Sequence, residues 1–333
     1  MLDKIEISLK PKYSAEPPFV SVKIDGDIIY EGPLDSNKGL VHNAELSESF
    51  SIEIDKRGKT KSLAKAGENQ EVKISSLLLN GLSVHPDKFG KFYQNGNAFV
   101  GEKIIDGDTM ALNGVWKLDL PIFRQPFAPD LDPYLYREKF SNTDIACFGC
   151  SFTWGWLLNH DQTWPYYLSN TKSKNYGVGG NSISSIIGTA HWFAKNFECN
   201  QMILLLPHPC RLQVKDNDKF CTLLPGRTPE IEKKFETIQK VIAKHGETSL
   251  LISGYANTIR ELLSEINTEI QNLYITSYQE DLYKLLPTIV GGTAKVLPFY
   301  NLDKNLPLAS DNEHPGPDHN RIFANQIRPI IGG

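Results

Sequence analysis

Residues 145–155 have the sequence IACFGCSFTWG, and this stretch decides the fold of the second half of the chain. The apolar run from Ile145 to Phe148 predicts a buried strand. Two small residues follow, then Ser151, and a helix is expected from Phe152 onward. A serine at this place is either an ordinary helix cap or a nucleophile that a sharp turn holds toward a substrate.

The rest of the second half alternates short apolar runs with helical patterns. The clearest helical pattern covers 183–197, where apolar residues recur at helical spacing. This alternation predicts an α/β fold, in which helices cover both faces of a parallel sheet. Active sites in such sheets lie beyond the carboxyl ends of the strands, which is where Ser151 is expected. The predicted strands cover 145–148, 202–206, 249–253, 273–276 and, more weakly, 295–297.

The first half has a different pattern. Alternating apolar and polar residues, as in Ile5 to Leu9, are separated by turn sequences such as Asp25-Gly26-Asp27 and Asn80-Gly81. Short strands with frequent turns predict an antiparallel β-sandwich. A proline-rich stretch then suggests a linker. We therefore expect three segments: a β-sandwich domain over 1–125, a linker over 126–141, and an α/β domain over 142–333.

Composition excludes several classes of partner. The chain has 333 residues with 35 Lys and Arg against 39 Asp and Glu, and this balance does not predict a nucleic-acid partner. No apolar run approaches the ~18–20 residues of a membrane span, so no membrane partner is expected. The opening MLDKIEISLK alternates like a strand and does not resemble a signal peptide. We therefore expect a cytoplasmic protein, and leave open non-classical export or association with a virion.

The five cysteines argue against a disulfide framework, because the number is odd and the chain is large. Cys147 and Cys150 have the spacing of a redox pair or half of a zinc site. No second C-x-x-C occurs, so we expect no metal site.

A serine nucleophile needs a base, an orienting carboxylate and donors for the oxyanion. The segment DNEHPGPDHN, residues 311–320, places Asp311 and His314 three residues apart in a loop. This spacing lets the carboxylate meet one imidazole nitrogen while the other nitrogen faces Ser151, as a catalytic triad requires. The backbone N–H of Ser151 would itself point toward the oxyanion.

Four motifs together resemble the GDSL/SGNH hydrolase family over about residues 142–329. They are GCSFTWG at 149–155, TWPYYL at 163–168, NYGVGG at 175–180 and DNEHPGPDHN at 311–320. The resemblance implies a flavodoxin-like α/β domain of the kind found in esterases, acetylesterases and lipases. It implies Ser151 as nucleophile, Asp311 and His314 as its partners, and the backbone N–H of Gly180 as an oxyanion donor. His319 matches a second histidine that is not catalytic in the family.

Two positions depart from the family pattern. The aspartate that usually precedes the serine is Cys150 here. A G-x-N-D turn, whose asparagine donates to the oxyanion, is expected after the strand at 202–206, but PHPCR stands at 207–211. Loss of one such donor costs ~10²–10³ in rate. His208 and Asn181 are the candidates to replace it.

Two further residues are candidates for substrate binding. Arg211 could bind an anionic group, although a surface salt bridge is the simpler interpretation. Trp154 could line a sugar pocket, because an indole face packs on the apolar face of a pyranose, although core packing explains it equally well.

The sequence therefore predicts a serine esterase that hydrolyses an ester through an acyl-serine intermediate and without a cofactor. The favoured substrate is an O-acetyl group on a carbohydrate. The substrate would be a small-molecule or polysaccharide ester. The β-sandwich would be a carbohydrate-binding or accessory module, with Phe92, Tyr93 and Trp116 as either stacking platforms or core.

One alternative to the esterase function is a catalytically weak SGNH-like binding or structural module of a phage or surface-polysaccharide system. A second alternative is a lipase or thioesterase. The sequence does not set the oligomeric state.

Overall fold

A computed structural model shows two compact units. It describes residues 2–46, 49–60, 62, 63, 66, 68–86, 90–94, 97, 98, 108–132, 134–211, 213–216, 219–222 and 248–332. The first unit contains Met1–Arg124 and Ser249–Gly254, and the second contains Gln125–Thr248 and Tyr255–Gly333. Residues 126–141, expected as a linker, fall in the second unit, where Phe140 packs against Tyr176 and Trp192.

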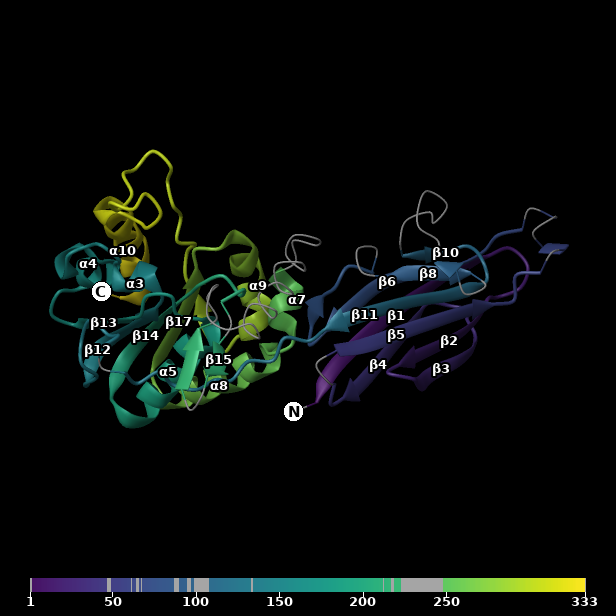
Figure 1. Cartoon of the computed structure of the whole chain (residues 1–333), viewed down its shortest axis with the longest axis horizontal. Helices are drawn as coiled ribbons and strands as arrows, with labels where there is room; N and C mark the ends of the chain where they lie inside the picture. The colour runs from purple at the N-terminus through teal and green to yellow at the C-terminus, as the bar shows by residue number, and fades with distance from the viewer. Residues whose placement is uncertain are drawn as a thin grey trace. The chain divides into compact units, whose positions relative to one another are not determined.

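The first unit is an antiparallel β-sandwich, as predicted (Figure 1). One sheet has the order β10-β6-β1-β4, with β7 paired to β6, and the other has the order β3-β2-β5-β11-β8-β9. The strands are β1 (Asp3–Tyr13), β2 (Phe19–Ile24), β3 (Asp27–Pro33), β4 (Lys38–Ala44), β5 (Ser49–Arg57), β6 (Gln70–Leu79), β7 (Leu82–Ser83), β8 (Lys91–Gln94), β9 (Asn97–Ala98), β10 (Thr109–Met110) and β11 (Gly114–Pro121).

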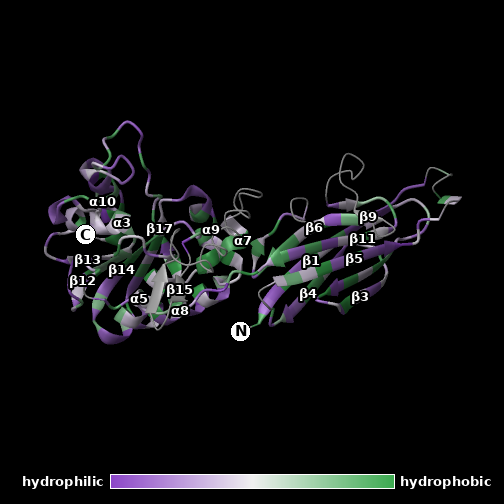
Figure 2. Cartoon of the chain, in the orientation of Figure 1, coloured by the Kyte–Doolittle hydropathy of each residue, from purple (hydrophilic) through white to green (hydrophobic). Residues whose placement is uncertain are grey.

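Alternation along the strands builds the sandwich core. Figure 2 shows hydrophobic and hydrophilic residues taking turns along β1 and β4, and every second residue of β1 from Asp3 to Leu9 is buried. The predicted turn between β2 and β3 is confirmed, with Asp25 at φ 49° and Gly26 at φ 90°. Two successive left-handed residues are what a tight two-residue hairpin requires.

Two of the aromatic residues considered as sugar platforms belong to this core. Phe92 is 5% exposed and Trp116 is 2% exposed. Neither therefore offers an open ring face for stacking.

The second unit is an α/β domain, also as predicted. Its parallel sheet has the order β13-β12-β14-β17-β18, which is the flavodoxin-like arrangement. Ile203, Leu204 and Leu205 of its central strand are fully buried, because helices cover both faces. The strands are β12 (Thr143–Gly149), β13 (Ser173–Gly177), β14 (Cys199–Leu206), β17 (Asn272–Ser277) and β18 (Lys295–Val296), and β15 (Gln213–Asp216) pairs with β16 (Lys219–Thr222) as a separate hairpin.

The helices pack in two layers (Figure 1). On one side, α5 packs against α8; on the other, α4 and α10 contribute to a core cluster with side chains of β12, β14 and β17. The helices of this unit are α3 (Ser151–Trp154), η1 (His160–Gln162), α4 (Trp164–Leu168), α5 (Ile183–Asn196), α8 (Ala256–Glu269), α9 (Glu280–Val290) and α10 (Pro317–Ile331). A further helix, α7 (Thr248–Ser253), belongs to the first unit from Ser249 onward. None of the helices in the described part of the chain has the length and apolar character that a membrane crossing needs.

One predicted strand is wrong. Residues 249–253 form most of α7, and the fifth strand of the sheet is β13, which the sequence did not reveal. A short apolar run buried on all sides does not distinguish a strand from a helix, and Leu250, Leu251 and Ile252 are all at most 1% exposed. β13 was missed because its sequence, SKNYG, contains little apolar character.

Candidate active site

The turn between β12 and α3 sets the position of Ser151. Ser151 is the first residue of α3, and only Cys150 separates it from Gly149 at the carboxyl end of β12. A Cβ added at Gly149 would lie 2.0 Å from Thr153 Oγ1 and 3.1 Å from the carbonyl oxygen of Leu205. A larger residue at Gly149 would force this turn apart. The glycine therefore lets the helix begin directly against the sheet edge.

Asp311, His314 and Ser151 form a continuous hydrogen-bonded chain. His314 Nδ1 lies 2.5 Å from Asp311 Oδ2, and His314 Nε2 lies 2.9 Å from Ser151 Oγ. An ionised carboxylate only accepts hydrogen bonds, so Nδ1 carries the proton and Nε2 is left to accept from the serine hydroxyl. The sequence thus identified three residues that the fold brings together from positions 163 residues apart.

The loop that carries the histidine is closed at its base. Leu308 pairs with Pro315, and the N–H of Ala309 donates to the carbonyl oxygen of His314. A Cβ added at Gly316 would lie 2.3 Å from the carbonyl oxygen of Pro307. These close contacts fix the direction of the imidazole.

Local hydrogen bonds keep Asp311 ionised. Desolvation opposes the charge, but the backbone N–H groups of Glu313 and His314 both donate to Oδ1 at 3.1 Å, and the imidazole adds a further bond. The net effect lowers the pKa of Asp311 to about 2. The carboxylate is therefore charged at neutral pH and can stabilise an imidazolium.

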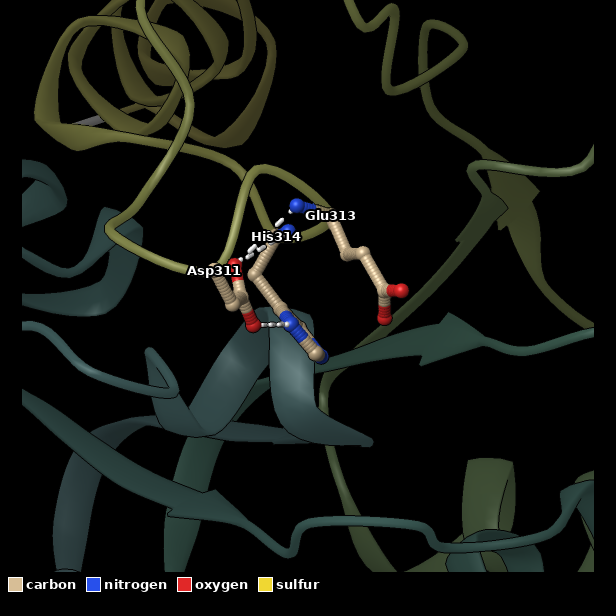
Figure 3. A group of neighbouring side chains, drawn as sticks. All are labelled: Asp311, Glu313 and His314. Carbon is tan, nitrogen blue, oxygen red and sulfur yellow. Dashed lines mark hydrogen bonds and ion pairs between the residues drawn. The ribbon is translucent and has the colours of Figure 1, made fainter.

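Glu313 is the third side chain near this pair. Ligand atoms of Asp311, Glu313 and His314 lie within 4.8 Å of one another, the spacing of a possible cation site. Figure 3 shows Asp311 and Glu313 on opposite sides of the imidazole. A cation between them would compete with the Asp311–His314 hydrogen bond, so the residues present fit a triad better than a metal centre.

The loop after β13 carries Gly180, the residue expected to supply a backbone donor. β13 pairs with β12, and the N–H of Val178 donates to the carbonyl oxygen of Gly149, so this loop lies beside the serine turn. Gly180 has φ 76°, in the left-handed region that favours glycine. Asn181 is buried and accepts from the N–H of Ser182 through Oδ1. Its side-chain nitrogen remains as a donor.

The loop after β14 brings two side-chain donors to the same edge of the sheet. His208 accepts a hydrogen bond from the N–H of Cys210 at Nδ1, which leaves its proton on Nε2. Burial, and then the charge of Arg211, lower the pKa of His208 and keep it neutral. Both residues follow the end of β14, whose partner strand β12 ends at the serine turn.

Arg211 neighbours Cys150, the residue before the nucleophile. Burial disfavours its charge, but the neighbouring Cys150 and Tyr278 outweigh this effect and raise the pKa of the guanidinium. The Cys150 thiol itself donates to the Tyr278 hydroxyl over 3.7 Å. Within the described residues, Arg211 Nη1 is buried and has no hydrogen-bond partner.

The remaining candidates have structural surroundings. His319 is 2% exposed, and its Nε2 bonds the carbonyl oxygen of Asp303, so it anchors the loop before the triad. Trp154 is half-buried, and its ring packs on Gly179. Cys147, Cys150, Cys199 and Cys210 are free, while the side chain of Cys221 lies outside the described part.

Arg137 is a residue that the sequence did not indicate. Its guanidinium donates to the carbonyl oxygens of Trp154, Gly155 and Leu158, and so braces the segment that follows the nucleophile. No local pattern announces this role, because the contacts span 17 to 21 residues.

No protein-family model and no curated protein matches the chain. The chain is similar in structure to an acetyl xylan esterase from the rumen bacterium Butyrivibrio proteoclasticus, with 12% identity and a TM-score of 0.37 over 99% of this chain and 88% of that one. It is also similar to a family two carbohydrate esterase from Clostridium thermocellum in complex with cellohexaose, with 11% identity and a TM-score of 0.33 over 99% and 90%. The module vCBM60 in complex with galactobiose matches 34% of this chain and 96% of its own, with 12% identity and a TM-score of 0.24.

Proposed function

We propose that the chain is a serine esterase that removes O-acetyl groups from a carbohydrate. The observation that supports this most strongly is the hydrogen-bonded chain from Asp311 through His314 to Ser151 Oγ. A serine cap needs neither a histidine at 2.9 Å nor a carboxylate behind that histidine. The arrangement has the order and spacing of a nucleophile, a base and an orienting acid.

The reaction would proceed in two steps. Ser151 Oγ attacks the ester carbonyl while His314 Nε2 takes its proton, and the charge of Asp311 stabilises the resulting imidazolium. His314 then returns the proton to the leaving alkoxide, which leaves the acyl group on Ser151. A water molecule activated by the same imidazole attacks the acyl-serine and releases the carboxylic acid. No step requires a cofactor.

The oxyanion would form beside the backbone N–H groups of Ser151 and Gly180. The first N–H groups of a helix have no partner within it, and Ser151 begins α3. His208 Nε2, Arg211 Nη1 and the side-chain nitrogen of Asn181 are the candidates to replace the asparagine expected after β14. A donor of this kind is worth ~10²–10³ in rate.

The test is hydrolysis of 4-nitrophenyl acetate, butyrate and octanoate by the wild type, Ser151→Ala and His314→Ala. We expect the acetate to be the best substrate and each substitution to lower its kcat by at least ~10³-fold. Equal rates for the wild type and both variants would exclude the triad and favour the binding-module alternative. A preference for octanoate would favour the lipase alternative.

A further inference from the structure

A small pocket lies next to the proposed triad and has no role in the chemistry described above. Its volume is about 180 Å³, and it is lined by Arg137, Trp154, Trp156 and Leu157. Pockets for drug-sized ligands measure ~300–1,000 Å³. This pocket therefore has room for one ring or a short chain, and not for a long acyl tail.

The pocket adjoins the reacting groups on two sides. The ring centroid of Trp156 lies 6.3 Å from that of His314. A Cβ added at Gly179 would lie 2.9 Å from Trp154 and 3.5 Å from Trp156, so the two indoles close over the residue before Gly180. A group held here would be next to both the base and the oxyanion donor.

The pocket wall is fixed in place before any ligand binds. Arg137 donates to the carbonyl oxygens of Trp154, Gly155 and Leu158. Leu157 is held at φ 61°, a left-handed conformation that non-glycine residues rarely adopt. Such backbone strain persists where the surroundings impose it, commonly at ligand sites.

The lining is open to a ligand. Trp156 is 41% exposed and Leu157 is 55% exposed, so an indole and an aliphatic side chain face solvent beside a polar catalytic centre. Within the described part of the chain, the hydrogen bonds of Arg137 use Nε and Nη2. Nη1 is therefore the nitrogen left to meet a ligand oxygen.

We propose that this pocket binds one pyranose ring of the acetylated glycan, with an apolar ring face on Trp156 and a hydroxyl accepting a hydrogen bond from Arg137. The proposal rests on the esterase function above and specifies its substrate. A pyranose presents one apolar face and several hydroxyls, which matches an indole beside a guanidinium. An acyl chain would desolvate the guanidinium without offering it an acceptor, which is unfavourable.

The test compares Trp156→Ala and Trp156→Phe with Ile330→Ala. Ile330 is a matched control because it is 48% exposed and lies near the far end of α10 from the triad. The substrates are 4-nitrophenyl acetate, 4-nitrophenyl octanoate and acetylated xylo-, cello- and galacto-oligosaccharides. We expect Trp156→Ala to lower kcat/KM for one of the glycans ~10-fold more than for 4-nitrophenyl acetate, the size of an aromatic stacking contribution.

Trp156→Phe should recover part of this loss, and Ile330→Ala should show none. Equal losses on the glycan and on 4-nitrophenyl acetate would overturn the sugar pocket while leaving the esterase intact. A selective loss on the octanoate would assign the pocket to the acyl group and overturn the proposal.

A binding measurement separates this proposal from the esterase itself. Calorimetric titration of Ser151→Ala with the deacetylated oligosaccharides should show binding to at least one of them, and adding Trp156→Ala should weaken it ~10-fold. This result would support the pocket even if the wild type hydrolysed no ester. Binding to none of the three glycans, or binding that Trp156→Ala leaves unchanged, would overturn it.

Discussion

Replacing Lys56 by methionine should stabilise the first unit at neutral pH. Lys56 occupies the last inward position of β5, in line with the buried Phe50, Ile52 and Ile54. It is 0% exposed, and its Nζ has no hydrogen-bond partner in the described part of the chain. Burial and the charge of Lys59, opposed by Glu71, lower its pKa from 10.5 to about 8.

The size of the effect follows from this shift. Each pH unit between the unfolded and folded pKa corresponds to ~1.4 kcal/mol, so the change from 10.5 to about 8 costs the wild type about 3 kcal/mol at pH 7. Between pH 8 and 10.5 the unfolded chain binds more protons than the folded chain. Stability of the wild type therefore rises with pH in that window, and the cost falls to about 1 kcal/mol at pH 10.

The assay is urea unfolding followed by circular dichroism at pH 7 and pH 10, with Lys10→Met as an exposed-lysine control. Lys56→Met should be more stable than the wild type by about 3 kcal/mol at pH 7, and by about 1 kcal/mol at pH 10. Lys10→Met replaces an exposed side chain and should change stability by no more than about 0.5 kcal/mol. A Lys56→Met protein that is less stable than the wild type at pH 7, or whose advantage is equal at both pH values, would refute the reasoning.

Three further predictions concern the second unit. Asp311→Asn leaves the imidazole without its carboxylate and should lower kcat on 4-nitrophenyl acetate by ~10⁴-fold, as the same change does in a Ser-His-Asp protease; a loss under tenfold would contradict this role. His208→Ala and Arg211→Met test the oxyanion donor, and the variant that removes this donor should lower kcat ~10²–10³-fold at unchanged KM. If both variants lose less than tenfold in kcat, the loop after β14 provides no oxyanion donor. Gly177→Ala places a Cβ 2.3 Å from a backbone nitrogen of α3 and should lower the free energy of unfolding by ~1–3 kcal/mol in a thermal melt. Gly39→Ala is the control, because a Cβ there would have nothing within 4 Å. Equal stability of the two variants would contradict the close packing at Gly177.

Much of the fold follows from local patterns in the sequence. The Asp25-Gly26 turn and the helix at 183–197 were predicted because turn chemistry and helical periodicity act over a few residues. Residues 249–253 were misassigned because five apolar residues fit either a strand or a buried helix. β13 was missed because its pairing with β12, and not its own composition, makes it a strand.

Local motifs also predict part of the candidate active site, while contacts between distant loops determine the rest. Ser151, Asp311 and His314 were predicted as a triad because two short motifs carry them, and the fold brings their side chains into hydrogen-bond contact. The bracing of the Trp154–Leu158 segment by Arg137 and the burial of Arg211 Nη1 were not predictable, because both depend on contacts between loops. The sequence also left open whether Phe92 and Trp116 are stacking platforms or core, because an aromatic residue in the sequence does not reveal whether its ring is buried.

In the proposed triad, His314 activates Ser151 as a nucleophile. The most direct measurement is labelling with a serine-reactive fluorophosphonate, located by peptide mass spectrometry, in the wild type and in His314→Ala. The triad predicts a covalent adduct on Ser151 in the wild type and loss of labelling in the variant. An unlabelled Ser151 in the wild type, or equal labelling of both proteins, would contradict it.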